Sequence, residues 1–273
     1  MSNPRRAIAR VSFPTHPSRL RSLRAGGATA WTHPMTILHL TDFHFNKRWF
    51  NWLLHHAPAH DLAVISGNLL DRADAMPQRR QIEWVSDWLG DFPCPLALCS
   101  GAHDLEWDRK AGRWTPAYWL RDIENPHVWT DGQRIELNEL SILNIGATTR
   151  PKGGEADVWI VHTPPANTLV ATRTDGVDAG DRDLASAVHR HAPRLVLAGR
   201  VHAPMHWREQ RGGTLFLNPG HNPGAPFPNH ILVQTENLRS RFIRAPQEDA
   251  DREQLRLNGL LEAEPTNAAM AIA

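Results

Sequence analysis

The sequence predicts an α/β fold organised as one main domain. Short apolar runs typical of buried strands alternate with longer stretches of helical periodicity, and the C-terminal third is rich in strand-like runs. A chain of 273 residues is long enough to bury one substantial core. Together these observations favour an α/β sandwich over two separate domains.

Nine runs have the length and composition of strands. In chain order they are 36–41, 61–66, 95–100, 139–145, 156–161, 194–198, 214–217, 229–234 and 240–244. The first three are separated by helix-like stretches, which is the alternation expected of strand–helix–strand units.

Three helices are expected within the domain. The stretch 47–57 carries Trp49, Phe50, Leu53 and Leu54, and the stretch 78–90 places Ile82, Val85 and Leu89 at i, i+3 and i+7. A third helix at 181–190 is expected to begin at Asp181 or Asp183.

The two ends of the chain differ in composition from the middle. Residues 1–34 contain six arginines, four prolines and no acid, and they lack the apolar core of a secretory signal. We interpret them as a disordered basic extension, or as an addition from an upstream start codon with the true start at Met35; an organelle transit peptide is the alternative. The domain is expected at 35–245. An acidic, Ala-rich tail is expected at 246–273, with one helix near 248–262.

Composition restricts the class of partner. The net charge of +1 argues neither for nor against a polyanionic partner, and we do not expect nucleic acid. No apolar stretch approaches the roughly 18–20 residues needed to cross a membrane. Cys94 and Cys99 form neither a zinc-type pair nor a disulfide framework, so a reduced, cytoplasmic setting is expected.

Polar fragments follow several of the predicted strands. Asp42 and His44 lie two apart at the end of the first strand, where a carboxylate and an imidazole can face one cation. Functional residues of open α/β sheets gather at the carboxyl ends of strands. The later fragments are Ser66-Gly-Asn-Leu-Leu-Asp-Arg72, Ser100-Gly-Ala-His-Asp104, Val161-His-Thr-Pro-Pro165 and Ala198-Gly-Arg-Val-His202.

These ordered fragments resemble the calcineurin-like phosphoesterase family. Its signatures run Asp-x-His, Gly-Asp-x-x-Asp-Arg, Gly-Asn-His-Asp/Glu, a lone His, and Gly-His-x-His. Leu217-Asn-Pro-Gly220 matches the turn that usually follows the last signature. The resemblance covers about 35–220 and implies two mixed β-sheets packed face to face with helices outside. It also implies hydrolysis of phosphate esters.

In that family two metal ions clamp a phosphate while an activated water attacks phosphorus. The resemblance implies that Asp42, His44 and His202 bind the first ion. Asn68 stands where the family has an aspartate shared by both ions, and a neutral amide is a poorer ligand for two cations. The chain therefore resembles a divergent member of the family with a degenerate dinuclear site.

The second ion loses more of its ligands. Of the set implied for it alone, only His162 remains, because Ala102 and Arg200 replace the family's asparagine and histidine. Without the bridging carboxylate, two dications lack the main anionic ligand that offsets their repulsion. We expect one divalent ion at most (Mn, Zn or Fe), or none. Arg200 is expected to pair with phosphate oxygens in place of the lost cation.

The positions that the family uses for proton transfer and phosphate binding retain the family's residues more completely than the metal-ligand positions do. The resemblance implies that His103 assists the leaving oxygen and that Asp71 orients His103. It also implies that Arg72 binds phosphate. Asp104 matches an acidic position that is more often structural than catalytic.

Two functional hypotheses from different classes follow. The first is a divergent phosphoesterase acting on a phosphate-ester small molecule or nucleotide. The second is a pseudoenzyme that binds a phosphate-bearing ligand or a protein partner without turnover, with Arg200 paired to Asp42 or Asp71 at a metal-free site. The stretch 105–121 is interpreted as an amphipathic cover over the core, with the border of a substrate pocket as the alternative.

Overall fold

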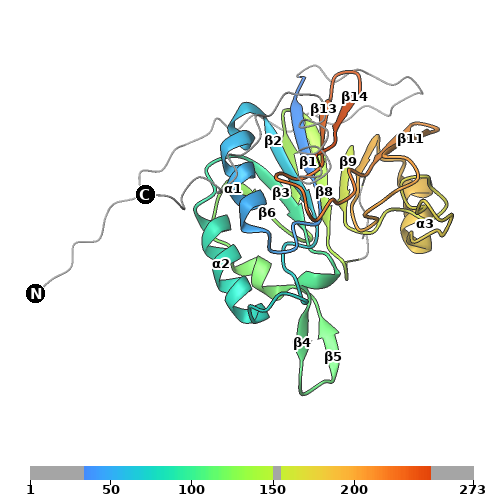
Figure 1. The fold of residues 1–273 in the computed structure, drawn as a ribbon. Helices are drawn as coiled ribbons and strands as arrows, with labels where there is room; N and C mark the ends of the chain where they lie inside the picture. The colour runs from blue at the N-terminus through green and yellow to red at the C-terminus, as the bar shows by residue number, and fades with distance from the viewer. Residues whose placement is uncertain (1–33, 150–154, 247–273) are drawn as a thin grey trace, which may run out of the picture.

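The computed structural model describes residues 34–149 and 155–246. Two six-stranded mixed sheets pack face to face, with helices on both outer faces (Figure 1). This arrangement confirms the predicted sandwich. Within the described ranges no helix is long and apolar enough to cross a membrane. The helix expected near 248–262, and nearly all of the expected extension and tail, lie outside the described residues.

The first sheet has the strand order β14-β13-β1-β2-β3-β6. Strands β1, β2, β3 and β6 are parallel, and β13 and β14 add an antiparallel edge. The bounds are β1 Thr36–Leu40, β2 Leu62–Ser66, β3 Leu96–Cys99, β6 Val128–Trp129, β13 His230–Gln234 and β14 Arg239–Ile243.

The second sheet has the order β11-β12-β10-β9-β8-β7, with four parallel strands between two antiparallel edges. The bounds are β7 Arg134–Leu137, β8 Leu140–Ile145, β9 Val158–Val161, β10 Leu195–Leu197, β11 Arg208–Arg211 and β12 Thr214–Leu217. All nine predicted strands are present to within two residues at each end, while β6, β7 and β11 were not predicted.

Helices α1 (Lys47–His56) and α2 (Gln78–Gly90) cover the first sheet, and α3 (Arg182–His191) covers the second (Figure 1). The α3 helix starts after Asp181, whose side chain accepts the Leu184 N–H at 2.8 Å. The described residues also form three short 3₁₀ helices: η1 Ala57–Ala59, η2 Ala102–Asp104 and η3 Tyr118–Asp122.

Three apolar layers hold these elements together. Ile37 of β1 faces the layer between the two sheets, whereas its neighbours Leu38 and Leu40 face α1 and α2. The third layer lies between the second sheet and α3 and includes Trp159. Because both faces of the central strands are buried, their sequences are nearly continuous apolar runs.

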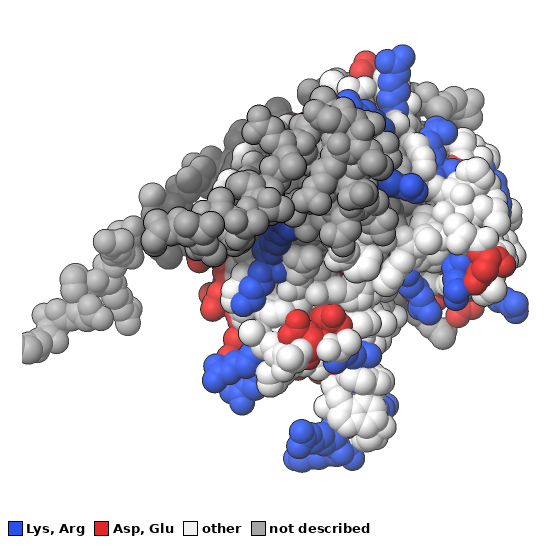
Figure 2. Space-filling view, viewed as in Figure 1, with Lys and Arg blue, Asp and Glu red and all other residues white. Residues whose placement is uncertain are grey.

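A hairpin of β4 (Glu106–Asp108) and β5 (Arg113–Thr115) projects from the sandwich (Figure 1). Trp107 and Trp114 on it are 48% and 44% exposed, and Figure 2 shows basic side chains gathered at its end. The interpretation of 105–121 as a cover is therefore wrong for the hairpin. It holds for Trp119 and Leu120 in η3, which are buried.

Candidate metal centre

The loops after β1, β2, β3, β9 and β10 bring the predicted site residues together from both sheets. Backbone hydrogen bonds join the first two loops: the Asp42 N–H donates to the Gly67 carbonyl at 3.0 Å, and the His44 N–H to the Asn68 carbonyl at 2.9 Å. The φ angles of Asp42, His44 and Asn68 are 53°, 44° and 53°. Left-handed φ is uncommon outside glycine and clusters at functional sites.

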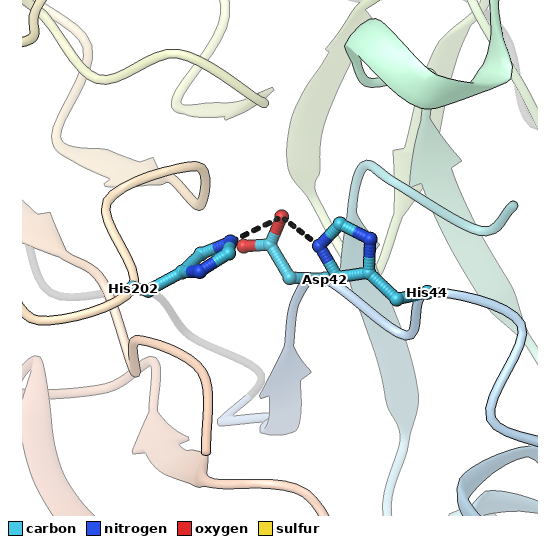
Figure 3. Close-up of side chains that lie close together, drawn as sticks. All are labelled: Asp42, His44 and His202. Atoms are coloured by element: carbon cyan, nitrogen blue, oxygen red, sulfur yellow. Dashed lines mark ion pairs between the residues drawn. The ribbon is translucent and has the colours of Figure 1, made fainter. Parts of the chain in front are cut away.

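The two carboxylate oxygens of Asp42 have different surroundings. Oδ2 accepts the Thr41 hydroxyl and the Arg200 backbone N–H, both at 2.9 Å. Oδ1 lies 3.7 Å from His44 Nε2 and 3.9 Å from His202 Nε2 (Figure 3). Burial favours the neutral acid, but the neighbouring histidines and the Thr41 hydrogen bond hold the pKa of Asp42 below its ordinary value.

The donor atoms of Asp42, His44 and His202 fit a divalent ion. They lie within 4.8 Å of one another, and bonds of about 2.0–2.1 Å in a tetrahedral site would separate them by about 3.4 Å. His44 Nε2 is buried and has no hydrogen-bond partner among the described residues. Burial lowers the pKa of His44 to about 4 although Asp42 opposes the shift, so at neutral pH the ring is uncharged, as metal binding requires.

Asn68 is held by two hydrogen bonds that fix its amide orientation. Its Nδ2 donates to Asp42 Oδ1 at 2.8 Å, and its Oδ1 accepts the His103 backbone N–H at 3.0 Å. The reverse orientation would set a carbonyl against a carboxylate and an NH₂ group against an N–H. In this arrangement Asn68 offers the site a donor, and binding an ion through its oxygen requires the amide to turn over.

The second-ion positions contain one imidazole and one guanidinium. His162 Nδ1 lies 2.9 Å from the Ser66 carbonyl, and its buried Nε2 has no hydrogen-bond partner within the part of the chain that the structure describes. The Arg200 guanidinium instead donates to the Thr163 hydroxyl at 3.1 Å. Among the described residues it forms no salt bridge with Asp42 or Asp71, so the pairing considered for a metal-free site is absent.

His103 and Asp71 lie close, as the sequence predicts. His103 Nδ1 is 3.5 Å from Asp71 Oδ1 and accepts the Arg72 backbone N–H at 3.2 Å. Burial is the main cause that lowers the pKa of His103, and Asp71 opposes it. The neutral ring therefore carries its proton on Nε2, because Nδ1 is an acceptor.

The Arg72 side chain contacts the hairpin. Its guanidinium lies 3.5 Å from the centroid of the Trp114 ring and donates to the carbonyls of Ala102 and Leu105. Arg72 therefore connects the base of the β4–β5 hairpin to the loop that holds His103. Asp104 is buried in the same loop and accepts the backbone N–H groups of Leu70 and Gly101, a structural role.

His221 lies at the site but was missed from the sequence. Its ring centroid is 4.9 Å from that of His44 and 4.6 Å from that of His202. The one feature of the sequence that could have indicated His221 is its position directly after the Asn-Pro-Gly turn.

A cavity of about 660 Å³ adjoins the site on the side of His202 and His221. Trp207 and Phe242 line it with their rings stacked at 5.6 Å, and Arg244 contributes a cation. The cavity therefore combines aromatic and basic groups next to the candidate metal ligands.

Fold and loops together define a metallophosphoesterase-type sandwich. The protein TT1561 of Thermus thermophilus is 15% identical to the chain, with a TM-score of 0.54 over 78% of this chain and 99% of that one. A structure described as a novel archaeal phosphodiesterase is also 15% identical, with a TM-score of 0.44 over 77% and 99%. At 15% identity the likeness to TT1561 shows the fold alone.

The sequence comparison reaches further. No curated protein matches the chain, but the sequence model of the calcineurin-like phosphoesterases matches residues 35–204, more than half of it. The chain belongs to the calcineurin-like phosphoesterase family.

Proposed function

We propose that the protein hydrolyses a phosphomonoester or phosphodiester with at most one divalent ion, bound by Asp42, His44 and His202. The observation that carries the proposal is the buried, unpartnered Nε2 of His44, which faces the same carboxylate oxygen as His202. Mn, Zn or Fe suits this donor set. Such an ion would polarise the phosphoryl group and lower the pKa of a water molecule.

His103 is proposed to donate to the leaving oxygen. The neutral ring can donate a hydrogen bond from Nε2–H. The protonated ring needs an acceptor for Nδ1–H, and Asp71 Oδ1 lies 3.5 Å away to serve as one. The negative charge of a bound phosphate favours the protonated form, which acts as a general acid.

Arg200 is proposed to bind phosphate beside His162. Its guanidinium is close enough to lower the pKa of His162, after the larger effect of burial. A planar guanidinium pairs well with phosphate oxygens, so it would supply positive charge where relatives have a second ion. Arg72 is a second candidate, but it must first leave the two carbonyls and the indole that now hold it.

A pseudoenzyme is the second candidate function. The observation that favours it is the Asn68 hydrogen bond to Asp42 Oδ1, the oxygen that would bind the ion. With that oxygen partly satisfied and Ala102 lacking a side-chain donor, the domain would bind a phosphate-bearing ligand or a protein partner without turnover.

The test combines metal content with turnover of generic aryl phosphomonoesters and phosphodiesters. Elemental analysis after dialysis against Mn²⁺ or Zn²⁺ should give about one ion per chain, lost in His44→Ala. In His103→Ala we expect the ion to stay and turnover to fall by roughly 10²- to 10⁴-fold. One ion with no turnover would support the pseudoenzyme. Two ions per chain would contradict the interpretation of Asn68 and Arg200.

The remaining proposals follow from composition and family. The substrate is proposed to be a small phosphate ester or nucleotide rather than nucleic acid, with its alcohol group in the cavity beside His202. Residues 35–245 are proposed as the phosphoesterase domain, 1–34 as a basic extension and 246–273 as a tail. A reduced, cytoplasmic location is proposed because neither Cys94 nor Cys99 is in a disulfide.

A further inference from the structure

His221 shares the centre of the site with two predicted metal ligands. The ring centroids of His44, His202 and His221 are 5.4, 4.9 and 4.6 Å apart in pairs. Nδ1 of His221 and Nε2 of His44 are both buried, and neither atom has a hydrogen-bond partner in residues 34–149 and 155–246. A packed core histidine would normally satisfy its buried nitrogens with protein groups.

These separations match three imidazoles around one ion. A ring bonded at about 2.0–2.1 Å through one nitrogen has its centroid about 3.2 Å from the ion, and tetrahedral angles then separate two centroids by about 5.2 Å. The three observed values, 4.6 to 5.4 Å, bracket that figure. The His221 nitrogens are not part of the group whose donor atoms lie within 4.8 Å of one another, so its ring must rotate to join them.

The turn that precedes His221 is built to hold it against His202. The buried amide of Asn218 donates to the carbonyls of Gly199 and Val201, which flank Arg200. The His221 N–H donates to the His202 carbonyl at 2.9 Å. Gly220 has φ +66°, and a Cβ there would lie 2.4 Å from the His202 carbonyl oxygen, so the two loops are in direct contact.

We propose that His221 is a fourth protein ligand, completing a site of one carboxylate and three imidazoles for a single nitrogen-preferring ion such as Zn²⁺. This inference rests on the proposed one-ion site and deepens it. Imidazole suits Zn, Cu, Fe and Ni, whereas Mn and Mg prefer oxygen ligands. His221 would thereby replace, as a ligand of the first ion, the aspartate that the family has at position 68, and it would narrow the choice of metal.

The test is metal affinity of the full chain after chelator treatment, by competition with a chromophoric chelator, for Zn²⁺ and Mn²⁺ separately. His221→Ala should weaken Zn²⁺ binding by about 100-fold or more, since even outer partners of metal ligands contribute 10–100-fold. The effect on Mn²⁺ should be smaller. The control is His206→Ala, an exposed histidine that lines the same cavity.

A second measurement does not depend on whether the variant folds. Co²⁺ added to the unmodified protein should give the intense visible absorption of four-coordinate cobalt, and the weak spectrum of a six-coordinate ion would overturn the proposal. Unchanged Zn²⁺ affinity in His221→Ala, with loss in His44→Ala, would remove His221 as a ligand and leave the one-ion site intact. No binding by the unmodified protein would overturn both.

Discussion

Restoring the family's aspartate at position 68 should destabilise the metal-free protein. In Asn68→Asp, a carboxylate oxygen replaces the amide nitrogen that lies 2.8 Å from Asp42 Oδ1. Two unit charges at that distance repel by about 6 kcal/mol at an effective dielectric constant of 20. Taking up one proton costs less, about 4 kcal/mol at pH 7 for a group of ordinary pKa near 3.9, and lets the new carboxyl donate to Asp42.

The penalty should therefore depend on pH and on metal. Proton uptake costs only about 1.5 kcal/mol at pH 5, so the destabilisation should shrink from about 4 to about 1.5 kcal/mol between pH 7 and pH 5. An ion between the two carboxylates offsets their repulsion. Zn²⁺ or Mn²⁺ should then stabilise Asn68→Asp more than the unmodified protein.

Urea unfolding at pH 7 and pH 5, with chelator and with added ion, measures each of these quantities. Asn51→Asp is the control, because it adds the same charge at an exposed position of α1. Equal stability of Asn68→Asp and the unmodified protein at pH 7 with chelator would refute the hydrogen bond between Asn68 and Asp42.

Two further predictions concern stability. Burial lowers the pKa of His39 to about 3 although Asp42 opposes it. The unfolded chain therefore binds more protons below pH 6.5, and stability is lost as pH falls through that value, by about 2 kcal/mol from this group between pH 7 and pH 5. His39→Gln should remove that part of the pH dependence in urea unfolding; parallel curves for the two proteins would contradict the assignment. Gly67→Ala should cost at least about 2 kcal/mol, because φ is +94° and a Cβ would lie 2.3 Å from His162 Nδ1, whereas Gly90→Ala, with open space, should be neutral or stabilising. Equal effects of the two glycine substitutions on the urea midpoint would argue against this placement of His162.

Strands were predicted correctly from the sequence where a short run of apolar residues marks them. Central strands such as Leu62–Ser66 are buried on both faces, so their composition alone reveals them. The missed strands lie at edges or in the hairpin, where two to four residues pair without an apolar run. Arg208–Arg211, reading Arg-Glu-Gln-Arg, is the clearest case.

The grouping of the candidate site residues was predicted where they occupy family positions. Their individual side-chain contacts were missed where the tertiary structure decides them. The structure brings Asp42, His44 and His202 together as expected. The direction of the Asn68 amide depends on the His103 backbone 35 residues away. The contact between Arg72 and Trp114 depends on the β4–β5 hairpin. From composition alone this segment was interpreted as an amphipathic cover over the core.

The origin of the ligands in both sheets has a consequence for the folding equilibrium. Asp42 follows β1 of the first sheet and His202 follows β10 of the second. An ion bound by both Asp42 and His202 would cross-link the two sheets, which the chain otherwise connects only through loops. Its binding free energy adds to that of folding, by about 2.7 kcal/mol at a free concentration 100 times Kd. Amide exchange should therefore slow together in β1 and β10 when metal is added, and a chelator should loosen both sheets at once.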